Sequence, residues 1–244
     1  MRKKILIVND DGIASEGLRK LAEAAARFGP VWVAAPTEQC SAMSQRITVF
    51  DKITVAPYPF PAPVEAAWAV GGTPADCVKA ALNYLLPERP DLVISGINNG
   101  YNTGFDIAYS GTVGAAMEAL MQGIPAMAFS NGYNGSFETT DAYLPLLLED
   151  LIQDPPPENG IWNVNFPGIP LEECQGIQRD CAIAPLQLYG DFFRREELED
   201  GAFTLHNQAI LAVAKDAPEG TDVRAVLSGY VSVGTVRCSV LTGR

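Results

Sequence analysis

Strands and helices alternate in the pattern of apolar and polar residues over the first part of the chain. Two short segments, Lys4 to Val8 and Val31 to Ala35, are almost entirely apolar, which is typical of strands buried on both faces. Between them, apolar side chains recur at helical spacing after Ser15, and Gly29-Pro30 ends the segment. A strand, a helix and a second strand in this order favour a parallel sheet.

The alternation continues to about residue 130. Thr73-Pro74-Ala75-Asp76 has the composition of a helix start, with Thr as the cap, Pro at the first helical position and Asp at the third. A third helix is predicted after Ser110, and Gly96 to Asp106 has neither a helical nor a strand period. Further strands are predicted at Ile47 to Ala56, Trp68 to Val70, Asp91 to Ser95 and Ala126 to Phe129. We therefore expect an α/β fold with a Rossmann-like, doubly wound and mainly parallel sheet.

The pattern changes in the C-terminal part of the chain. Pro155 to Pro157 interrupt it, Ile161 to Asn165 and Gly229 to Val233 have the composition of strands, and Phe203 to Ala214 alternates as in a β-hairpin. We expect one domain over residues 1–244, with a Rossmann-like core over about 1–130. The remainder, about 131–244, forms an extension that contains hairpins.

Composition narrows the class of protein. Hydrophobic residues make up 48% of the 244 residues, enough for a core without disulfides, and the five cysteines form no C-x-x-C pair. The N-terminal apolar run is too short for a signal peptide, and no stretch approaches the roughly 20 apolar residues of a membrane span. We expect a soluble, cytoplasmic protein. The net charge of −12 argues against a nucleic-acid duplex as partner, but a small phosphate ester fits if a bound cation reverses the local field.

Four polar segments follow the predicted strands. They are Asn9 to Gly12, Thr37 to Ser44, Gly71 to Asp76 and Gly96 to Thr112. Ligands of open parallel sheets bind where the loops after the strands converge, so the four segments together predict a binding site.

The first segment contains adjacent carboxylates. Asp10 and Asp11 either shape a turn and cap the next helix, or they hold a divalent cation that offsets their mutual repulsion. The amide oxygens of Asn98, Asn99 and Asn102 suit Mg²⁺ or Mn²⁺ rather than zinc. His206 is the only histidine, so neither a histidine-rich metal site nor a Ser-His-Asp triad is easily built, and we expect it to be an ordinary surface or partly buried residue.

Ser110-Gly111-Thr112 opens a helix, where free N–H groups and the positive end of the helix dipole bind phosphate. Ser110 could act only as a helix cap, or it could both cap the helix and bind phosphate. Asp76 is best explained as part of the cap at Thr73. The chain has neither a Walker A loop nor a G-x-G-x-x-G segment, which disfavours a dinucleotide cofactor.

Taken together, these segments resemble the SurE family of survival proteins, which are metal-dependent 5′-nucleotidases. The matching strings are ILIVNDDGI at 5–13, VAAP with Ser41 beyond it, GGTPADCV at 71–78, SGINNGYNTGFDIAYSGTVGAAMEA at 95–119, NVNFP at 163–167 and TDVRAVLSGYVSV at 221–233. Two segments depart from the usual family pattern, at Glu38 to Ala42 and at Ser232 to Val236.

The resemblance implies a phosphomonoesterase that converts nucleoside 5′-monophosphates, and in some members 3′-monophosphates and short polyphosphate, to dephosphorylated products. It implies one Mg²⁺ or Mn²⁺ per subunit and a homodimer or homotetramer built through the C-terminal portion. It places metal ligands at Asp10, Asp11, Ser41 and Asn98, catalytic residues at Asp10, Asp11 and Asn102, and phosphate contacts at Asn98, Asn102, Ser110, Gly111 and Thr112.

Two other classes would also fit parts of the pattern. A non-catalytic nucleotide- or metal-binding sensor would keep the same loops without turnover. A receiver-like signalling domain also carries acids after its first strand, but it needs a phosphoacceptor Asp and a partner Lys after later strands, and none stands out here.

Overall fold

The computed structural model describes residues 2–190, 193–207, 210–211 and 216–241. Among these residues, nine strands form one sheet in the order β3-β4-β2-β1-β5-β6-β7-β13-β8. The strands of this sheet are β1 (Ile5–Val8), β2 (Val31–Pro36), β3 (Val55–Pro57), β4 (Ala66–Val70), β5 (Leu92–Asn99), β6 (Ala126–Asn131), β7 (Gly160–Phe166), β8 (Ile177–Cys181) and β13 (Val231–Arg237).

The main helices are α1 (Glu16–Ala25), α2 (Pro74–Ala80), α3 (Gly111–Met121), α4 (Glu138–Gln153) and α5 (Asp222–Leu227). Shorter helical segments are the π-helix η1 (Ala81–Leu85) and the 3₁₀ helices η2 (Gly104–Tyr109), η3 (Leu171–Glu173), η4 (Glu199–Gly201) and η5 (Ser239–Leu241).

The sheet is parallel from β4 through β2, β1, β5 and β6 to β7. The edge strand β3 is antiparallel to β4, and β13 is antiparallel to β7. Strand β1 lies between β2 and β5, so the chain winds outward in both directions from β1, and the expected doubly wound, mainly parallel sheet is confirmed. In such a sheet, the switch point beside β1 is where ligands bind.

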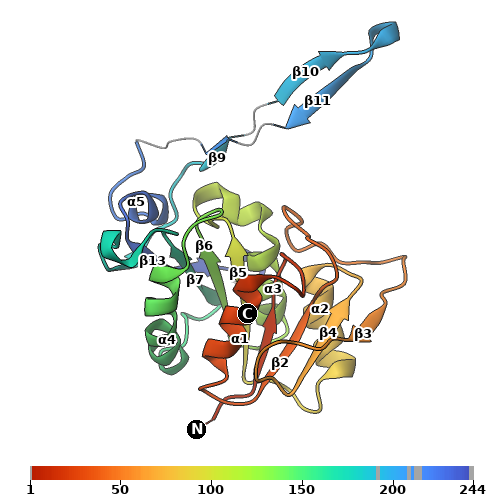
Figure 1. Cartoon of the computed structure of the whole chain (residues 1–244), viewed down its shortest axis with the longest axis vertical. Helices are drawn as coiled ribbons and strands as arrows, with labels where there is room; N and C mark the ends of the chain where they lie inside the picture. Colours follow the sequence, from red (N-terminus) through yellow and green to blue (C-terminus); the bar gives the residue numbers. More distant parts are fainter. Residues whose placement is uncertain (1, 191–192, 208–209, 212–215, 242–244) are drawn as a thin grey trace.

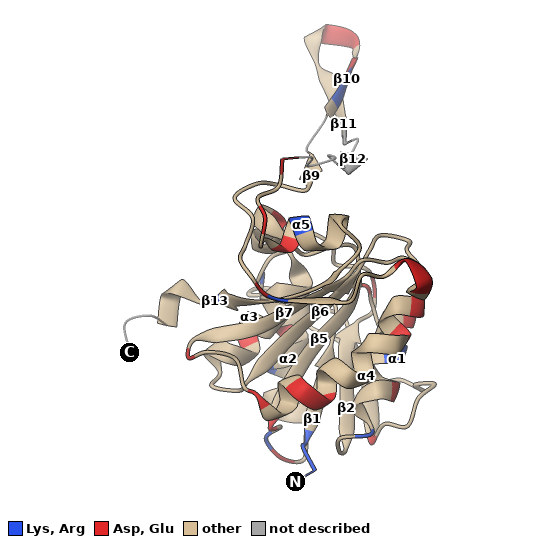
Figure 2. Cartoon of the chain, turned by 90° about the vertical axis from the view of Figure 1, so that its left-hand side faces the viewer, with Lys and Arg blue, Asp and Glu red and all other residues tan. Residues whose placement is uncertain are grey.

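Helices cover both faces of the sheet. One apolar layer joins the sheet to α1 and α4 through residues such as Leu18 and Leu147, and the other joins it to α2 and α3 through residues such as Val78 and Ala116. Figure 2 shows α1 and α4 on one side of the sheet. Side chains of β1 alternate between the two layers, which explains why the strand is apolar throughout.

Three predicted helix starts are confirmed by hydrogen bonds. The hydroxyl of Ser15 accepts from the N–H of Leu18, and that of Ser110 accepts from the N–H of Val113. At α2, Thr73 and Asp76 form a capping box, in which each side chain accepts from the backbone N–H of the other residue.

The strand predicted at Ile47 to Ala56 is largely wrong, because only Val55–Pro57 forms a strand. Phe50 is 97% exposed and Val49 is 65% exposed, and of this segment's described apolar residues before β3 only Ile53 packs against the core. The backbone N–H of Thr48 donates to the carboxylate of Asp76 instead of to a neighbouring strand.

The segment predicted to lack periodic structure, Gly96 to Asp106, contains regular structure at both ends. Strand β5 continues to Asn99, where Asn98 and Asn99 pair with Ser130 and Asn131 of β6, and η2 begins at Gly104. The apolar pattern predicted a strand only to Ser95, but hydrogen bonds between strands are formed by the backbone and do not require apolar side chains. The strand therefore extends beyond its apolar residues.

Helix α4 was not predicted. It contains Pro145, which normally disfavours a helix interior, but Leu144, Leu147, Leu148 and Leu151 pack into the core. Tertiary packing therefore outweighs the local signal.

The sheet continues past residue 130, since β7, β13 and β8 extend it. A separate antiparallel hairpin of β10 (Phe193–Glu197) and β11 (Phe203–Asn207) projects from the body in Figures 1 and 2. Near its base, β9 (Tyr189–Gly190) pairs with β12 (Ile210–Leu211). Residues 208–209 and 212–214 of the predicted hairpin segment lie outside the described residues. No helix in the described part of the chain combines the length and apolar character needed to cross a membrane.

Candidate active site

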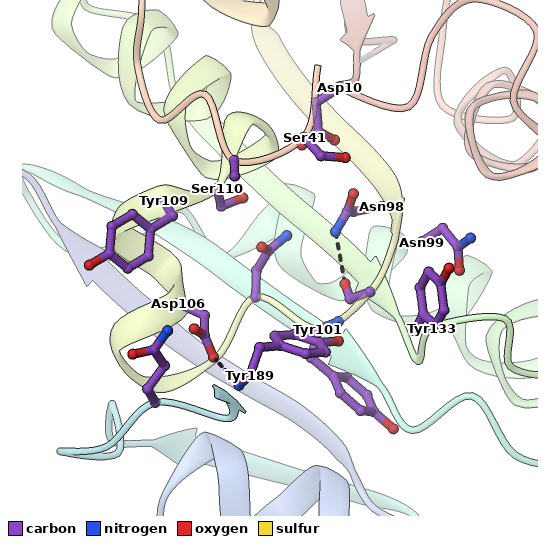
Figure 3. Close-up of a pocket in the computed structure, with 14 residues that line it drawn as sticks. Asp10, Ser41, Asn98, Asn99, Tyr101, Asp106, Tyr109, Ser110, Tyr133 and Tyr189 are labelled. Atoms are coloured by element: carbon purple, nitrogen blue, oxygen red, sulfur yellow. Dashed lines mark hydrogen bonds between the residues drawn. The ribbon is translucent and has the colours of Figure 1, made fainter. Parts of the chain in front are cut away.

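A cavity of about 400 Å³ lies at the carboxyl ends of β1 and β5, at the switch point of the sheet (Figure 3). Five of the predicted site residues line it: Asp10, Ser41, Asn98, Asn102 and Ser110. The other lining residues are Ala42, Asn99, Gly100, Tyr101, Asp106, Tyr109, Tyr133, Gln187 and Tyr189.

Asp10 lies two residues after the end of β1 and is only 4% exposed. The hydroxyl of Thr112 donates to its Oδ1 at 2.5 Å. At Gly111, an added Cβ would lie 3.0 Å from Asp10 Oδ2, so the first turn of α3 packs closely on this carboxylate. Gly111 and Thr112, predicted as phosphate contacts, therefore lie against Asp10 and are not among the residues that line the cavity.

The pKa of Asp10 is raised from 3.8 to about 7, chiefly by burial and also by the neighbouring charge of Asp11, while the Thr112 hydroxyl opposes the shift. A cation beside Asp10 would favour its charged form. Burial of Asp10 therefore disfavours its charged carboxylate, and a positive charge beside it would offset this cost.

Asp11 does not line the main cavity. It lies in an adjacent hollow with Gln39, Asn99 and Asn134, and its Oδ2 accepts from the backbone N–H of Asn99 at 2.8 Å. Burial raises the pKa of Asp11, while the Asn99 N–H and the Gln39 side chain lower it. Asp11 therefore joins the loop after β1 to the end of β5.

Asn98 and Ser41 face Asp10. The Asn98 amide nitrogen donates to the carbonyl of Gly100 at 2.9 Å, which leaves the amide oxygen directed toward Asp10 and Ser41 in Figure 3. The Ser41 hydroxyl accepts from the amide of Gln39 at 2.9 Å. One carboxylate, one amide oxygen and one hydroxyl thus converge on the same part of the cavity.

This donor set fits a hard divalent cation. Oxygen ligands of these three kinds suit Mg²⁺ or Mn²⁺, whereas zinc prefers Cys and His. Within the described ranges there is no cluster of three or more His, Cys, Asp or Glu side chains of the kind that would form an all-ionisable metal site. The described residues that line the cavity include no Lys, Arg or His. No positively charged side chain of the lining can therefore pair with an anionic ligand.

Asn102 is held by a buried polar cluster that the sequence analysis missed. Its backbone N–H donates to Asn165 at 2.8 Å, and its carbonyl accepts from the amides of Asn163 at 2.9 Å and Asn165 at 3.1 Å. Its side-chain amide donates to the hydroxyl of Ser130 at 2.8 Å. The sequence contained a signal for this cluster. Asn163 and Asn165 occupy alternate positions of an otherwise apolar strand, so their side chains must lie on the same face of the sheet.

The loop after β2 docks onto the end of η2, just before α3. Ser44 donates through its N–H to the carbonyl of Tyr109 and through its hydroxyl to that of Ala108, each at 2.9 Å. Ala42 and Ser44 have φ angles of 56° and 53°, a region that non-glycine residues rarely adopt. Such conformations persist only where the surrounding structure imposes them, and here they bring Ser41 to the cavity.

The other end of the cavity is aromatic. Tyr101, Tyr109, Tyr133 and Tyr189 line it, and none was predicted as a site residue. Asp106 accepts from the backbone N–H groups of Leu188 and Tyr189 at 2.7 and 3.1 Å, which joins the base of the projecting hairpin to the cavity. Tyr101, Asp106 and Tyr109 lie in the predicted segment Gly96 to Thr112, whereas Tyr133 and Tyr189 come from other parts of the chain, so no local pattern in the sequence grouped all of them.

One of the four predicted polar segments does not reach the cavity. In Gly71 to Asp76, the Asp76 carboxylate accepts from Thr73 and Thr48, and none of the segment's residues lines the site. The prediction that Asp76 serves the helix cap is confirmed. His206 lies exposed on the hairpin beside Glu196, as expected for an ordinary surface residue.

Known proteins are similar to this chain in sequence and in fold. The model of the family described as "Survival protein SurE" matches residues 5–185. A protein of Clostridium botulinum named 5′-nucleotidase SurE is 37% identical over 233 residues, which cover 94% of this chain and 90% of the relative. A protein of the same name from Protochlamydia amoebophila is 41% identical over 176 residues, covering 71% of this chain and 67% of the relative.

The fold is also similar to a solved structure. The crystal structure of the SurE protein from Aquifex aeolicus superimposes with a TM-score of 0.80 at 35% identity, covering 96% of this chain and 92% of the other. Sequence and fold agree over nearly the whole chain, and the protein belongs to the SurE family.

Proposed function

We propose that the protein is a metal-dependent phosphomonoesterase, a 5′-nucleotidase that hydrolyses nucleoside 5′-monophosphates to nucleoside and phosphate. Relatives that cover most of the chain carry the name 5′-nucleotidase SurE. The observation that carries the proposal is the cavity itself, where a buried carboxylate, neutral oxygen donors and the start of a helix converge without a cationic side chain. An anionic substrate requires a bound cation in such a site.

Asp10, Asp11, Ser41 and Asn98 are the proposed ligands of one divalent ion, Mg²⁺ or Mn²⁺. The orientation of the Asn98 oxygen and the burial of Asp10 support this set. Asp11 lies in the adjacent hollow, so its contribution is the least direct of the four. A divalent ion held there would neutralise phosphate charge and polarise the phosphorus atom.

The N–H groups at the start of α3, at Gly111 and Thr112, and the amide of Asn102 are the proposed stabilisers of charge on the transferring phosphoryl group. Ser110 caps that helix and lines the cavity, so it is the proposed contact at the phosphate. Water is the proposed nucleophile, since the D-x-D typical of an aspartyl-phosphate route is replaced by Asn9-Asp10-Asp11.

A non-catalytic sensor with the same cavity is not favoured, because the relatives are named as enzymes. Nucleoside 3′-monophosphates and short polyphosphate remain proposed additional substrates, and a cytoplasmic location remains a prediction. Assembly into a homodimer or homotetramer is proposed to involve the projecting hairpin, whose Phe193, Phe203 and Leu205 side chains are exposed.

The test is phosphate release from AMP by protein freed of metal with EDTA and then titrated with Mg²⁺ or Mn²⁺. We expect no turnover without metal and saturable recovery with it. Full activity in a sample verified as metal-free would exclude the metal requirement. Metal-restored binding of AMP without phosphate release would favour the sensor.

A further inference from the structure

We propose that Tyr109 and Tyr133, together with the fixed tyrosines Tyr101 and Tyr189, form a stacking subsite for a planar aromatic ring. Its ligand is the base of the nucleotide whose phosphate binds at the polar end of the cavity. The identity of that ligand rests on the proposed function, but the subsite itself rests on the placement of the four rings along one cavity.

The two flanking rings are unusually exposed for residues that line a cavity. Tyr109 is 54% exposed and Tyr133 is 65% exposed, and they lie on opposite sides of the cavity in Figure 3. Both rings therefore keep exposed apolar area in the folded protein, although burial of aromatic rings is normally favourable. A planar ligand that enters between them would cover those faces.

The backbones that carry these rings are nevertheless fixed. The carbonyl of Tyr109 accepts from Ser44, as described above. Beside Tyr133, the N–H of Asn134 donates to Asn99 Oδ1 at 2.7 Å, and the amide of Asn99 donates back to Asn134 at 3.2 Å. Two exposed rings on fixed backbones bind a flat ligand with little loss of chain entropy.

The remaining two tyrosines are held through their hydroxyl groups. The Tyr101 hydroxyl donates to the carbonyl of Pro167 at 2.6 Å, and the Tyr189 hydroxyl accepts from the Tyr101 N–H at 2.9 Å. Both rings are half-buried and fixed, so they can form a rigid apolar wall beside the flanking rings.

The chemistry of the two ends matches one class of ligand. The polar end offers oxygen donors and the start of a helix, and the other end offers aromatic faces in a cavity of about 400 Å³. A nucleoside monophosphate joins an anionic phosphate to a planar base in the same way. Stacking accepts any base because every base has a π-face, and larger purines gain more contact than pyrimidines.

The test compares AMP with ribose 5-phosphate, which has the same phosphoester and no base. We expect Tyr109→Ala and Tyr133→Ala each to raise the KM for AMP about 10-fold while leaving kcat and the KM for ribose 5-phosphate nearly unchanged. Tyr109→Phe and Tyr133→Phe keep the ring and should behave as the parent protein. Tyr84→Ala is the matched control, since Tyr84 is 88% exposed and does not line the cavity.

Equal effects of the Ala variants on AMP and ribose 5-phosphate, or no effect on either, would overturn the subsite while the phosphatase stands. Calorimetric titration with adenosine alone decides the same question without turnover. Weaker adenosine binding in the Ala variants, restored by Phe, supports the subsite even if no phosphatase activity is found. Undetectable adenosine binding by the parent protein, or binding that the Ala variants leave unchanged, overturns it.

Discussion

The polar and aromatic ends of the cavity are built in different ways. At the polar end, Asp10 and Asn102 are buried, and hydrogen bonds from α3, β6 and β7 hold their side chains or backbones. At the aromatic end, Tyr109 and Tyr133 have fixed backbones but rings that are more than half exposed.

This difference corresponds to two kinds of task. Groups that act on a reacting phosphate need fixed geometry, because displacement of about 1 Å can cost on the order of 100-fold in rate. Stacking on a base tolerates small displacements and exchange of one base for another. Substitutions at the polar end should therefore reduce turnover or metal binding without changing adenosine affinity. Substitutions at the aromatic end should weaken adenosine binding without changing metal binding or kcat.

The largest expected effect is that of Asp10→Asn. Asn keeps the size of the side chain and an acceptor for Thr112, but it removes the buried negative charge proposed to bind the ion. We expect kcat/KM for AMP at saturating metal to fall roughly 1,000-fold, since a bound ion is worth several kcal/mol at the transition state. Adenosine affinity should stay unchanged. Near-normal turnover would remove Asp10 from the proposed chemistry.

Stability provides a second readout of this variant in metal-free protein. Folding raises the pKa of Asp10 from 3.8 to about 7, so between these pH values the folded state binds more protons than the unfolded state. Stability of the parent protein should therefore fall as pH rises from about 4 to about 7, and Asp10→Asn should reduce that slope. Melting temperatures across this pH range, measured with EDTA present, check the sign.

Asp11→Asn should have a smaller effect, because Asp11 lies in the adjacent hollow and its carboxylate accepts from Asn99. We expect metal affinity to fall about 10- to 100-fold, with turnover largely recovered at high metal concentration. Titration of phosphate release against metal separates the two quantities. If affinity and turnover both match the parent protein, Asp11 only shapes the turn, where Asn is equally suitable.

The buried cluster behind Asn102 tests whether fixed geometry matters for turnover. Asn165→Ala removes the described acceptor of the Asn102 N–H. Asn163→Ala removes only one of two donors to the Asn102 carbonyl, because the bond from Asn165 remains. We expect Asn165→Ala to lower kcat about 10-fold with little change in KM, and to lower the unfolding free energy by about 1–3 kcal/mol.

Asn163→Ala should have smaller effects on both kcat and stability. Ser95→Ala controls for loss of a buried polar side chain, because the Ser95 hydroxyl is buried without a hydrogen-bond partner and makes no contact to Asn102 among the described hydrogen bonds. Equal loss of kcat in Ser95→Ala and Asn165→Ala would show that the effect is general destabilisation.

Ser110→Ala should have the smallest effect of the series. The backbone N–H groups of α3 remain, and only the cap to Val113 is lost, at a cost of about 1 kcal/mol in stability. We expect the KM for AMP to rise several-fold if the hydroxyl also contacts phosphate. Lower stability with unchanged KM would mean that Ser110 is a cap alone.

The sequence by itself determined the α/β order, the helix starts at Ser15, Thr73 and Ser110, and the positions of polar residues after strands. These are local properties: the free N–H groups at a helix start need acceptors within the same turn, and the period of apolar residues follows from the geometry of each element. The adjacent carboxylates after β1 and the helix start at Ser110 could be selected as candidates on this basis.

Only the tertiary structure decided which loops meet. The order of strands places β1 between β2 and β5, which brings Asp10, Ser41 and Asn98 together and leaves Gly71 to Asp76 outside the cavity. The tyrosines come from three separate segments, since only Tyr101 and Tyr109 share one, and the Asn pair of β7 reaches Asn102 across the sheet. Contacts between residues so distant in sequence depend on sheet order and register, which no local pattern encodes.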